Sequence, residues 1–84
     1  MSNMQLIEIT RGHLKVKAGA KDVTIYGEAF LRGHGSPDFL LYESSIEKWD
    51  VPNDQESVTP AEKEQLIQFL KEEFSRREMS LEIE

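Results

Sequence analysis

The chain has no cysteine and only three prolines among its 84 residues. The lack of cysteine excludes disulfide frameworks and thiolate metal sites, so an apolar core alone has to hold the fold. Such a composition fits a reducing compartment, and we expect a cytoplasmic protein. A chain of this length has room for one domain, residues 1–84, and a deep internal active site is not expected.

Long hydrophobic runs are also missing. No apolar segment approaches the roughly 18 residues of a membrane span. Residues 1–5 lack the basic flank and the apolar segment of a secretion signal. We therefore expect neither membrane association nor secretion.

Basic residues are scarce, with 10 Lys and Arg against 16 Asp and Glu, which gives a net charge of −6. The acidic excess lies in residues 43–84, because residues 1–42 are nearly balanced. Nucleic acid is therefore not an expected partner, whereas a basic protein surface would be attracted. The alternative is that the acidic residues only keep a small domain soluble.

Alternation of apolar and polar residues predicts a β-hairpin over residues 5–17, with its turn at Arg11-Gly12. Leu14 and Val16 fall on one face of its second strand. We expect Gly12 to take a positive φ in the turn, since glycine adopts this conformation at little cost.

Two further strands are predicted, from Val23 to Leu31 and from Phe39 to Ile46, on either side of a turn at residues 32–38. An isolated glycine, Gly27, predicts a bulge or bend in the first of them. The second begins with four apolar or aromatic residues, which indicates a central strand. Residues 48–50 extend it or begin a fifth strand.

A helix is predicted to begin at Thr59 after a polar connector. Thr59 can cap the helix, Pro60 fits its first position, and Glu62 completes a capping box. An apolar stripe follows at helical spacing, with Phe69 at its edge, and two ion pairs are expected on the outer face. The stripe is Leu66, Ile67, Leu70 and Phe74, and the pairs are Glu72–Arg76 and Glu73–Arg77.

The last five residues, 80–84, alternate and predict a final strand with Leu81 and Ile83 facing inward. The fold class is therefore α+β: an antiparallel β-meander of four to five strands, one long C-terminal helix packed on the sheet, and a final C-terminal strand.

Residues that could carry catalysis are few. His13 and His34, with Glu28 or Asp38, could form a metal site or an acid–base pair. Neither histidine lies at helical ligand spacing from a second ligand, and the glycine-rich loop around His34 lacks the lysine and the helix of a phosphate-binding loop. We therefore expect no enzyme, cofactor or metal, although a small enzyme using the His34 loop stays open.

One segment could bind a protein. Trp49 is the only tryptophan, and carboxylates surround it in the sequence. Aromatic side chains dominate binding hot spots, and an acidic ring around one suits a basic partner. The alternative is that Trp49 closes the core beneath the helix. The predicted contact residues are Tyr26, Glu28, Tyr42, Glu43, Glu47, Trp49 and Asp50.

Three segments carry a family resemblance: residues 9–14, ITRGHL; residues 23–28, VTIYGE; and residues 42–50, YESSIEKWD. In these segments the chain resembles the immunity protein 74 family, small bacterial α+β proteins of polymorphic toxin systems. The matching residues are Arg11, Gly12, Tyr26, Gly27, Glu28, Tyr42, Ser45, Ile46 and Trp49. The resemblance implies an antidote that binds and blocks a toxin.

Two functional hypotheses follow. The first is a stoichiometric inhibitor, in which Tyr42 and Trp49 make apolar contacts and nearby carboxylates pair with basic residues of a toxin. The second is a homo-oligomeric structural or regulatory module that pairs through the exposed edge of the strand at residues 80–84. We accordingly expect a monomer or a weak homo-oligomer.

Overall fold

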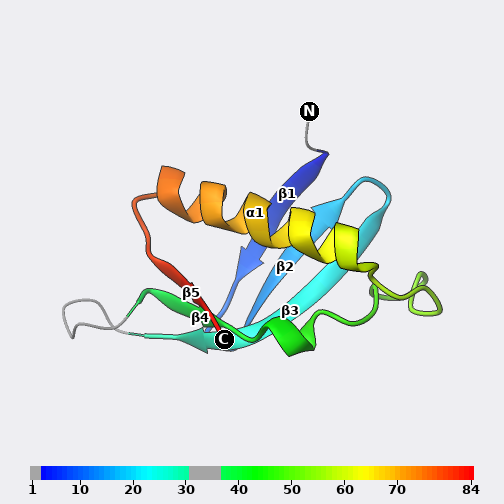
Figure 1. Ribbon diagram of the computed structural model, residues 1–84, viewed down its shortest axis with the longest axis horizontal. Helices are drawn as coiled ribbons and strands as arrows, with labels where there is room; N and C mark the ends of the chain where they lie inside the picture. Colours follow the sequence, from blue (N-terminus) through cyan, green and yellow to red (C-terminus); the bar gives the residue numbers. More distant parts are fainter. Residues whose placement is uncertain (1–2, 31–36) are drawn as a thin grey trace.

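The computed structural model describes residues 3–30 and 37–84, and within them one helix lies across one face of a five-stranded sheet (Figure 1). The strand order is β1-β2-β3-β4-β5. Neighbouring strands are antiparallel except β4 and β5, which are parallel. The α+β prediction is thus confirmed. The elements are β1 (Met4–Ile9), β2 (His13–Ala18), β3 (Lys21–Ala29), β4 (Phe39–Leu41), the 3₁₀ turn η1 (Glu43–Ser45), α1 (Pro60–Arg76) and β5 (Leu81–Ile83).

The predicted hairpin is formed by β1 and β2, and the side chain of Thr10 organises its turn. The Thr10 hydroxyl oxygen accepts hydrogen bonds from the backbone N–H groups of Gly12, at 3.3 Å, and His13, at 3.1 Å. The turn therefore needs no left-handed residue, and the positive φ predicted for Gly12 is wrong. Gly19, in the turn between β2 and β3, has the positive φ, +64°.

Of the bulge or bend predicted at Gly27, the bulge is wrong, and the described bulge lies in β1 instead. The register of β1 against β2 shifts between Leu6 and Glu8, so Ile7 is the extra residue of a β-bulge. Around Gly27 the pairings of β3 with β2 and with β4 show no shift. Glycine is needed there for space, because a Cβ atom at this position would lie 2.5 Å from Phe39 Cε1.

The strand predicted over residues 39–46 is shorter than expected. β4 ends at Leu41, and η1 follows. The N–H of Tyr42 donates to the Tyr26 carbonyl at 2.9 Å, and then the Ser45 hydroxyl, rather than a backbone carbonyl, accepts from the Tyr26 N–H at 3.0 Å. The Ser45 side chain thus takes the place of the backbone carbonyl that a longer β4 would have offered to β3, and the pairing of the two strands ends there. Residues 48–50 contribute only an isolated bridge between Lys48 and Ser57.

The helix α1 begins as predicted, since the capping box between Thr59 and Glu62 is complete and Pro60 is the first helical residue. Three residues of the predicted stripe, Leu66, Leu70 and Phe74, are buried against Leu14, Val16, Val23 and Ile25 of the sheet. Glu73 pairs with both Arg76 and Arg77, whereas Glu72 accepts from Gln68, so the predicted Glu72–Arg76 pair is wrong. Among the described residues, no helix combines the length and hydrophobicity needed to cross a membrane.

The helix ends in a Schellman motif, which turns the chain back toward the sheet. The Met79 N–H donates to the Phe74 carbonyl at 2.8 Å and the Glu78 N–H to the Ser75 carbonyl at 3.0 Å, with Glu78 at φ +57°. β5 then pairs with β4, and Leu81 and Ile83 pack against the core as predicted. Strands β1 and β5 are the two edges of the sheet.

Candidate protein-binding site

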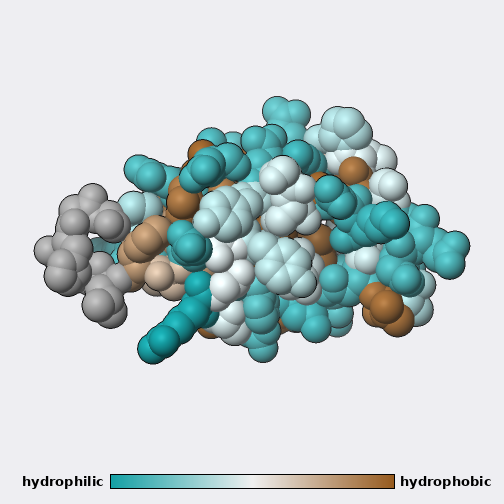
Figure 2. Space-filling view, turned by 90° about the horizontal axis from the view of Figure 1, so that it is seen from below, coloured by the Kyte–Doolittle hydropathy of each residue, from teal (hydrophilic) through white to brown (hydrophobic). Residues whose placement is uncertain are grey.

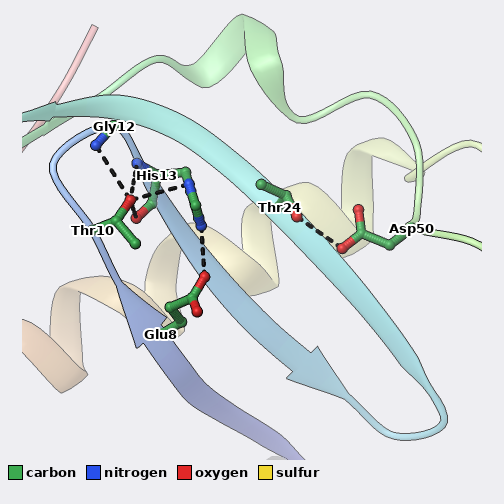
Figure 3. A network of polar contacts seen from close by, with 6 residues as sticks. All are labelled: Glu8, Thr10, Gly12, His13, Thr24 and Asp50. Carbon is green, nitrogen blue, oxygen red and sulfur yellow. Dashed lines mark hydrogen bonds and ion pairs between the residues drawn. The ribbon is translucent and has the colours of Figure 1, made fainter.

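The sheet face opposite α1, here called the open face, is covered by polar side chains. In Figure 3, Glu8, Thr10, His13, Thr24 and Asp50 lie in front of the sheet, and α1 lies behind it. Seen from below the molecule of Figure 1, the surface is mostly hydrophilic or of intermediate hydropathy, and strongly hydrophobic atoms occur only in small separate areas (Figure 2). The core therefore lies between the sheet and α1, and the open face is available for contact.

Strand alternation decides which side chains reach the open face. In β3, Val23 and Ile25 are buried, so Tyr26 and Glu28 project from the other side. Leu40 alternates in the same way with its buried neighbours in β4, and Glu82 alternates with the inward residues of β5. The register aligns Glu28, Leu40 and Glu82 in one row across three strands.

A second row lies beside the first. Tyr42 follows β4 and is hydrogen-bonded through its backbone to Tyr26, and Glu84 follows β5 and is hydrogen-bonded through its backbone to Glu43. Tyr26 is 55% exposed, and its ring lies edge-on to His13 with centroids 6.3 Å apart. The two rows form a tyrosine–glutamate surface, composed of Tyr26, Glu28, Leu40, Tyr42, Glu82 and Glu84.

This surface is acidic, with the carboxylates of Glu28, Glu82 and Glu84 and no lysine or arginine among its six residues. Within residues 3–30 and 37–84, no lysine or arginine pairs with Glu28, Glu82 or Glu84. The pKa of Tyr42 is raised by burial, by its hydrogen bond with Glu28, and by the charges of Glu28 and Glu84. The phenol therefore stays protonated and donates its hydrogen bond to the Glu28 carboxylate, and Glu28, Glu82 and Glu84 are exposed residues.

A titration tests this contact without any partner. In a Tyr26→Phe background, where Tyr42 is the one tyrosine left, Glu28→Gln should lower the pKa of Tyr42 toward its ordinary value, because the adjacent negative charge is removed. Ultraviolet absorbance of the phenolate measures the shift. Glu64→Gln, on the exposed side of α1, is the control and should leave the titration unchanged. An unchanged curve for Glu28→Gln would contradict the contact.

Of the seven predicted contact residues, Tyr26, Glu28 and Tyr42 come together on this surface. Glu43 lies next to it in the chain, but its carboxylate is directed to Lys63 of α1, 3.7 Å away. Glu47 is exposed in the connector, where its carbonyl accepts from the Val58 N–H. The carboxylate of Asp50 accepts from the Thr24 hydroxyl at 2.8 Å.

Trp49 lies in the core cluster and not on the tyrosine–glutamate surface. Only 4% of its surface is exposed, and it packs with Val58 and the sheet residues. The Lys21 ammonium lies 5.0 Å from the ring centroid and also pairs with Glu56 at 3.1 Å. This burial favours the alternative interpretation, in which Trp49 closes the core, while its contact with a partner stays a prediction.

Three residues of the surface, Leu40, Glu82 and Glu84, were absent from the sequence prediction. The alternation of residues 80–84 already pointed Glu82 and Glu84 outward once Leu81 was placed inward. Their position beside Glu28 and Tyr42 depends on β5 joining β4, which no local pattern specifies.

Catalytic groups do not gather in the described part of the chain. His13 lies between Glu8, whose carboxylate is 2.7 Å from Nε2, and Thr10, whose hydroxyl is 3.0 Å from Nδ1. These contacts brace the β1–β2 turn. No three His, Asp or Glu side chains among residues 3–30 and 37–84 are placed to hold a metal ion. His34 and the rest of segment 31–36 lie outside the described residues.

No curated protein and no solved structure matches the chain. The family model described as Immunity protein 74 matches residues 6–84, nearly the whole sequence. The chain therefore belongs to the immunity protein 74 family.

Proposed function

We propose that this protein is an immunity protein that neutralises a toxin by binding it through the tyrosine–glutamate surface and blocking it. Membership of the immunity protein 74 family is the observation that carries the function. Immunity proteins as a family are generally non-catalytic, and occlusion needs no bond to be made or broken. The partner is a toxin domain with a basic surface, and the inhibitor works without enzymatic activity, cofactor or metal.

Three carboxylates without a basic ion-pair partner among the described residues support the choice of surface. Glu28, Glu82 and Glu84 lie within one patch of a rigid sheet, so little conformational entropy is lost when a partner pairs with them. Tyr26 and Tyr42 supply aromatic area beside these charges, which is the composition of a binding hot spot. Charge complementarity of this kind accelerates association and excludes partners of the same sign.

Charge reversal tests the surface. Glu28→Lys and Glu82→Lys should each weaken binding to the toxin encoded next to this protein by at least about tenfold, because a like charge then faces the basic surface of the toxin. Tyr26→Ala should weaken it by a similar factor, through loss of a half-exposed aromatic contact. Titration calorimetry with the purified toxin domain measures the affinity, and growth of cells expressing the toxin measures protection.

The matched control is Glu64→Lys, which makes the same change of net charge on the exposed side of α1. It should bind as the wild type does. Equal weakening by Glu64→Lys would show that only net charge matters. If all the surface variants kept the affinity of the wild type, the toxin would have to bind another face of the protein. If the wild type itself did not bind the toxin, the inhibitor function would be rejected.

A further inference from the structure

His13 lies beside Tyr26 on the open face, and both nitrogens of its imidazole ring are engaged. The carboxylate of Glu8 lies 2.7 Å from Nε2, and the hydroxyl of Thr10 lies 3.0 Å from Nδ1 (Figure 3). Because an ionised carboxylate can only accept hydrogen bonds, Nε2–H is the donor to Glu8. Contacts at both nitrogens fix the orientation of the ring as well as its place.

The β-bulge at Ile7 brings Glu8 to this side of the sheet. Before the bulge, β1 and β2 pair in one register, and from Glu8 onward the register is shifted by one residue. In the first register Glu8 would stand opposite Leu14, whose side chain is buried in the core between the sheet and α1. In the shifted register it pairs with Lys15, which alternates onto the open face. Bulges near functional sites commonly redirect a side chain, and this one allows Glu8 to reach His13.

Thr10 contacts the other nitrogen of the ring from within the β1–β2 turn. Its backbone N–H donates to the His13 carbonyl at 2.9 Å, and its hydroxyl oxygen accepts from the N–H groups of Gly12 and His13. The hydroxyl hydrogen can then donate to Nδ1 of the imidazole. The same residue therefore fixes both the backbone and the ring of His13.

Tyr26 is the residue of the tyrosine–glutamate surface that this fixed ring touches. His13 and Tyr26 are directly opposed in the register of β2 and β3, and their ring planes are inclined at 67° with centroids 6.3 Å apart. Edge-to-face pairs at this distance attract one another. The Tyr26 backbone is also held, since its N–H donates to the Ser45 hydroxyl and its carbonyl accepts from the Tyr42 N–H. The side-chain torsions of Tyr26 are the remaining freedom, and His13 restricts them.

We propose that His13 is a positioning residue, which holds the Tyr26 ring in the orientation that contacts the toxin. This inference rests on the proposed function, because it concerns the same surface. An exposed aromatic side chain that turns freely loses conformational entropy when a partner immobilises it. Restricting the ring beforehand lowers that loss and raises affinity without any contact between His13 and the toxin. The loss for one side chain corresponds to a roughly two- to tenfold change in affinity.

The alternative is that His13 itself contacts the toxin. His13 is only partly exposed, whereas Tyr26 is 55% exposed. Both ring nitrogens of His13 already have partners in Glu8 and Thr10, so the imidazole has no unengaged nitrogen to offer to the toxin. The geometry therefore favours an effect of His13 through Tyr26.

Nuclear magnetic resonance of the isolated protein tests the positioning without a toxin. Three-bond couplings between the Hα and Hβ protons of Tyr26 should show one rotamer in the wild type. His13→Ala should move these couplings to rotamer-averaged values, and Glu8→Ala should move them part of the way.

The matched controls separate the hydrogen bond from the charge. Glu8→Gln removes the same charge as Glu8→Ala but keeps an oxygen that accepts from Nε2, so it should preserve the Tyr26 couplings. Glu64→Ala, on the exposed side of α1, should leave them unchanged. Averaged couplings in the wild type, or a single unchanged rotamer in His13→Ala, would overturn the proposal.

A double-mutant cycle in binding to the purified toxin domain tests the effect on function. His13→Ala should weaken binding by roughly two- to tenfold in the wild-type background. It should have no further effect in a Tyr26→Ala background, because no ring is left to position. Equal weakening in both backgrounds would show that His13 acts on the toxin directly, and this result would overturn the proposal.

The failure of this inference differs from the failure of the proposed function. If Tyr26→Ala weakens toxin binding while His13→Ala binds as the wild type does, the tyrosine–glutamate surface is retained and the positioning role is rejected. If the wild type does not bind the toxin, the proposed function is rejected and this inference with it.

Discussion

Replacing Gly27 with alanine should lower the free energy of unfolding by about 3 kcal/mol or more, because the added methyl group has no room. Its carbon would lie 2.5 Å from Phe39 Cε1 and nearer still to the carbonyl oxygen of Leu40. The obstacle is partly backbone, so rotating a side chain cannot relieve it. Either β4 moves away from β3, or the Phe39 ring leaves its place.

Both adjustments disturb the core. Phe39 is 1% exposed, and its ring lies 6.4 Å from that of Phe74 on α1. Displacing it loosens the contact between β4 and the helix, and also the row that aligns Glu28 with Leu40. For a chain of this size a loss of about 3 kcal/mol lowers the Tm by roughly 12–24 °C. Calorimetry or thermal circular dichroism measures it.

Gly12→Ala is the control for this prediction. A Cβ atom at Gly12 meets nothing within 4 Å, and the residue does not have a positive φ, so stability should change by no more than about 0.5 kcal/mol. If Gly27→Ala melted at the same temperature as Gly12→Ala, the close approach of β3 and β4 would be refuted.

These two glycines show where sequence reasoning succeeded and where it failed. Both were recognised as special, but the reasons were assigned from backbone conformation alone. Gly12 needs no positive φ because the Thr10 hydroxyl organises the turn, and Gly27 is required by a ring that arrives from twelve residues later. A local pattern can identify a glycine as unusual, but the atom that excludes a side chain belongs to another strand.

Which side of each strand or helix faces the core could be predicted from the sequence, whereas which elements lie next to one another in the sheet could not. Period-two alternation correctly put Leu14 and Val23 inward, and the capping box at Thr59 fixed the start of α1, because both depend on residues close in sequence. The parallel pairing of β5 with β4 depends on where α1 ends and on the turn at Glu78. The residues of the tyrosine–glutamate surface were therefore predicted only in part.

Aromatic residues were the most ambiguous. Tyr26 and Trp49 both lie among polar residues in the sequence, yet Tyr26 is 55% exposed and Trp49 is 4% exposed. The difference arises because Tyr26 belongs to the open face of a strand, whereas the connector holding Trp49 is tied to β3 by the Asp50 N–H, which donates to the Asp22 carbonyl at 2.8 Å. That tie, between residues far apart in sequence, directs the indole into the core.

Trp49→Ala should accordingly destabilise the protein by about 3–5 kcal/mol, since a large buried ring is removed and a cavity remains. Trp49→Phe should lose much less, because it keeps most of the buried area. It also removes the indole N–H, which has no hydrogen-bond partner among the described residues. Chemical denaturation followed by circular dichroism measures the free energy of unfolding of both variants. Lys21→Gln should lower this free energy by only about 0.5–1 kcal/mol, through loss of the cation–π contact with Trp49.

The same variants separate a packing role of Trp49 from a binding role. A buried residue affects toxin affinity only through the population of folded protein, so folded Trp49→Phe should bind the toxin as the wild type does, whereas folded Tyr26→Ala should not. If Trp49→Phe lost as much affinity as Tyr26→Ala while keeping its stability, the indole would have to reach the partner. The connector at residues 51–58 would then have to open on binding, and the contact would extend beyond the tyrosine–glutamate surface.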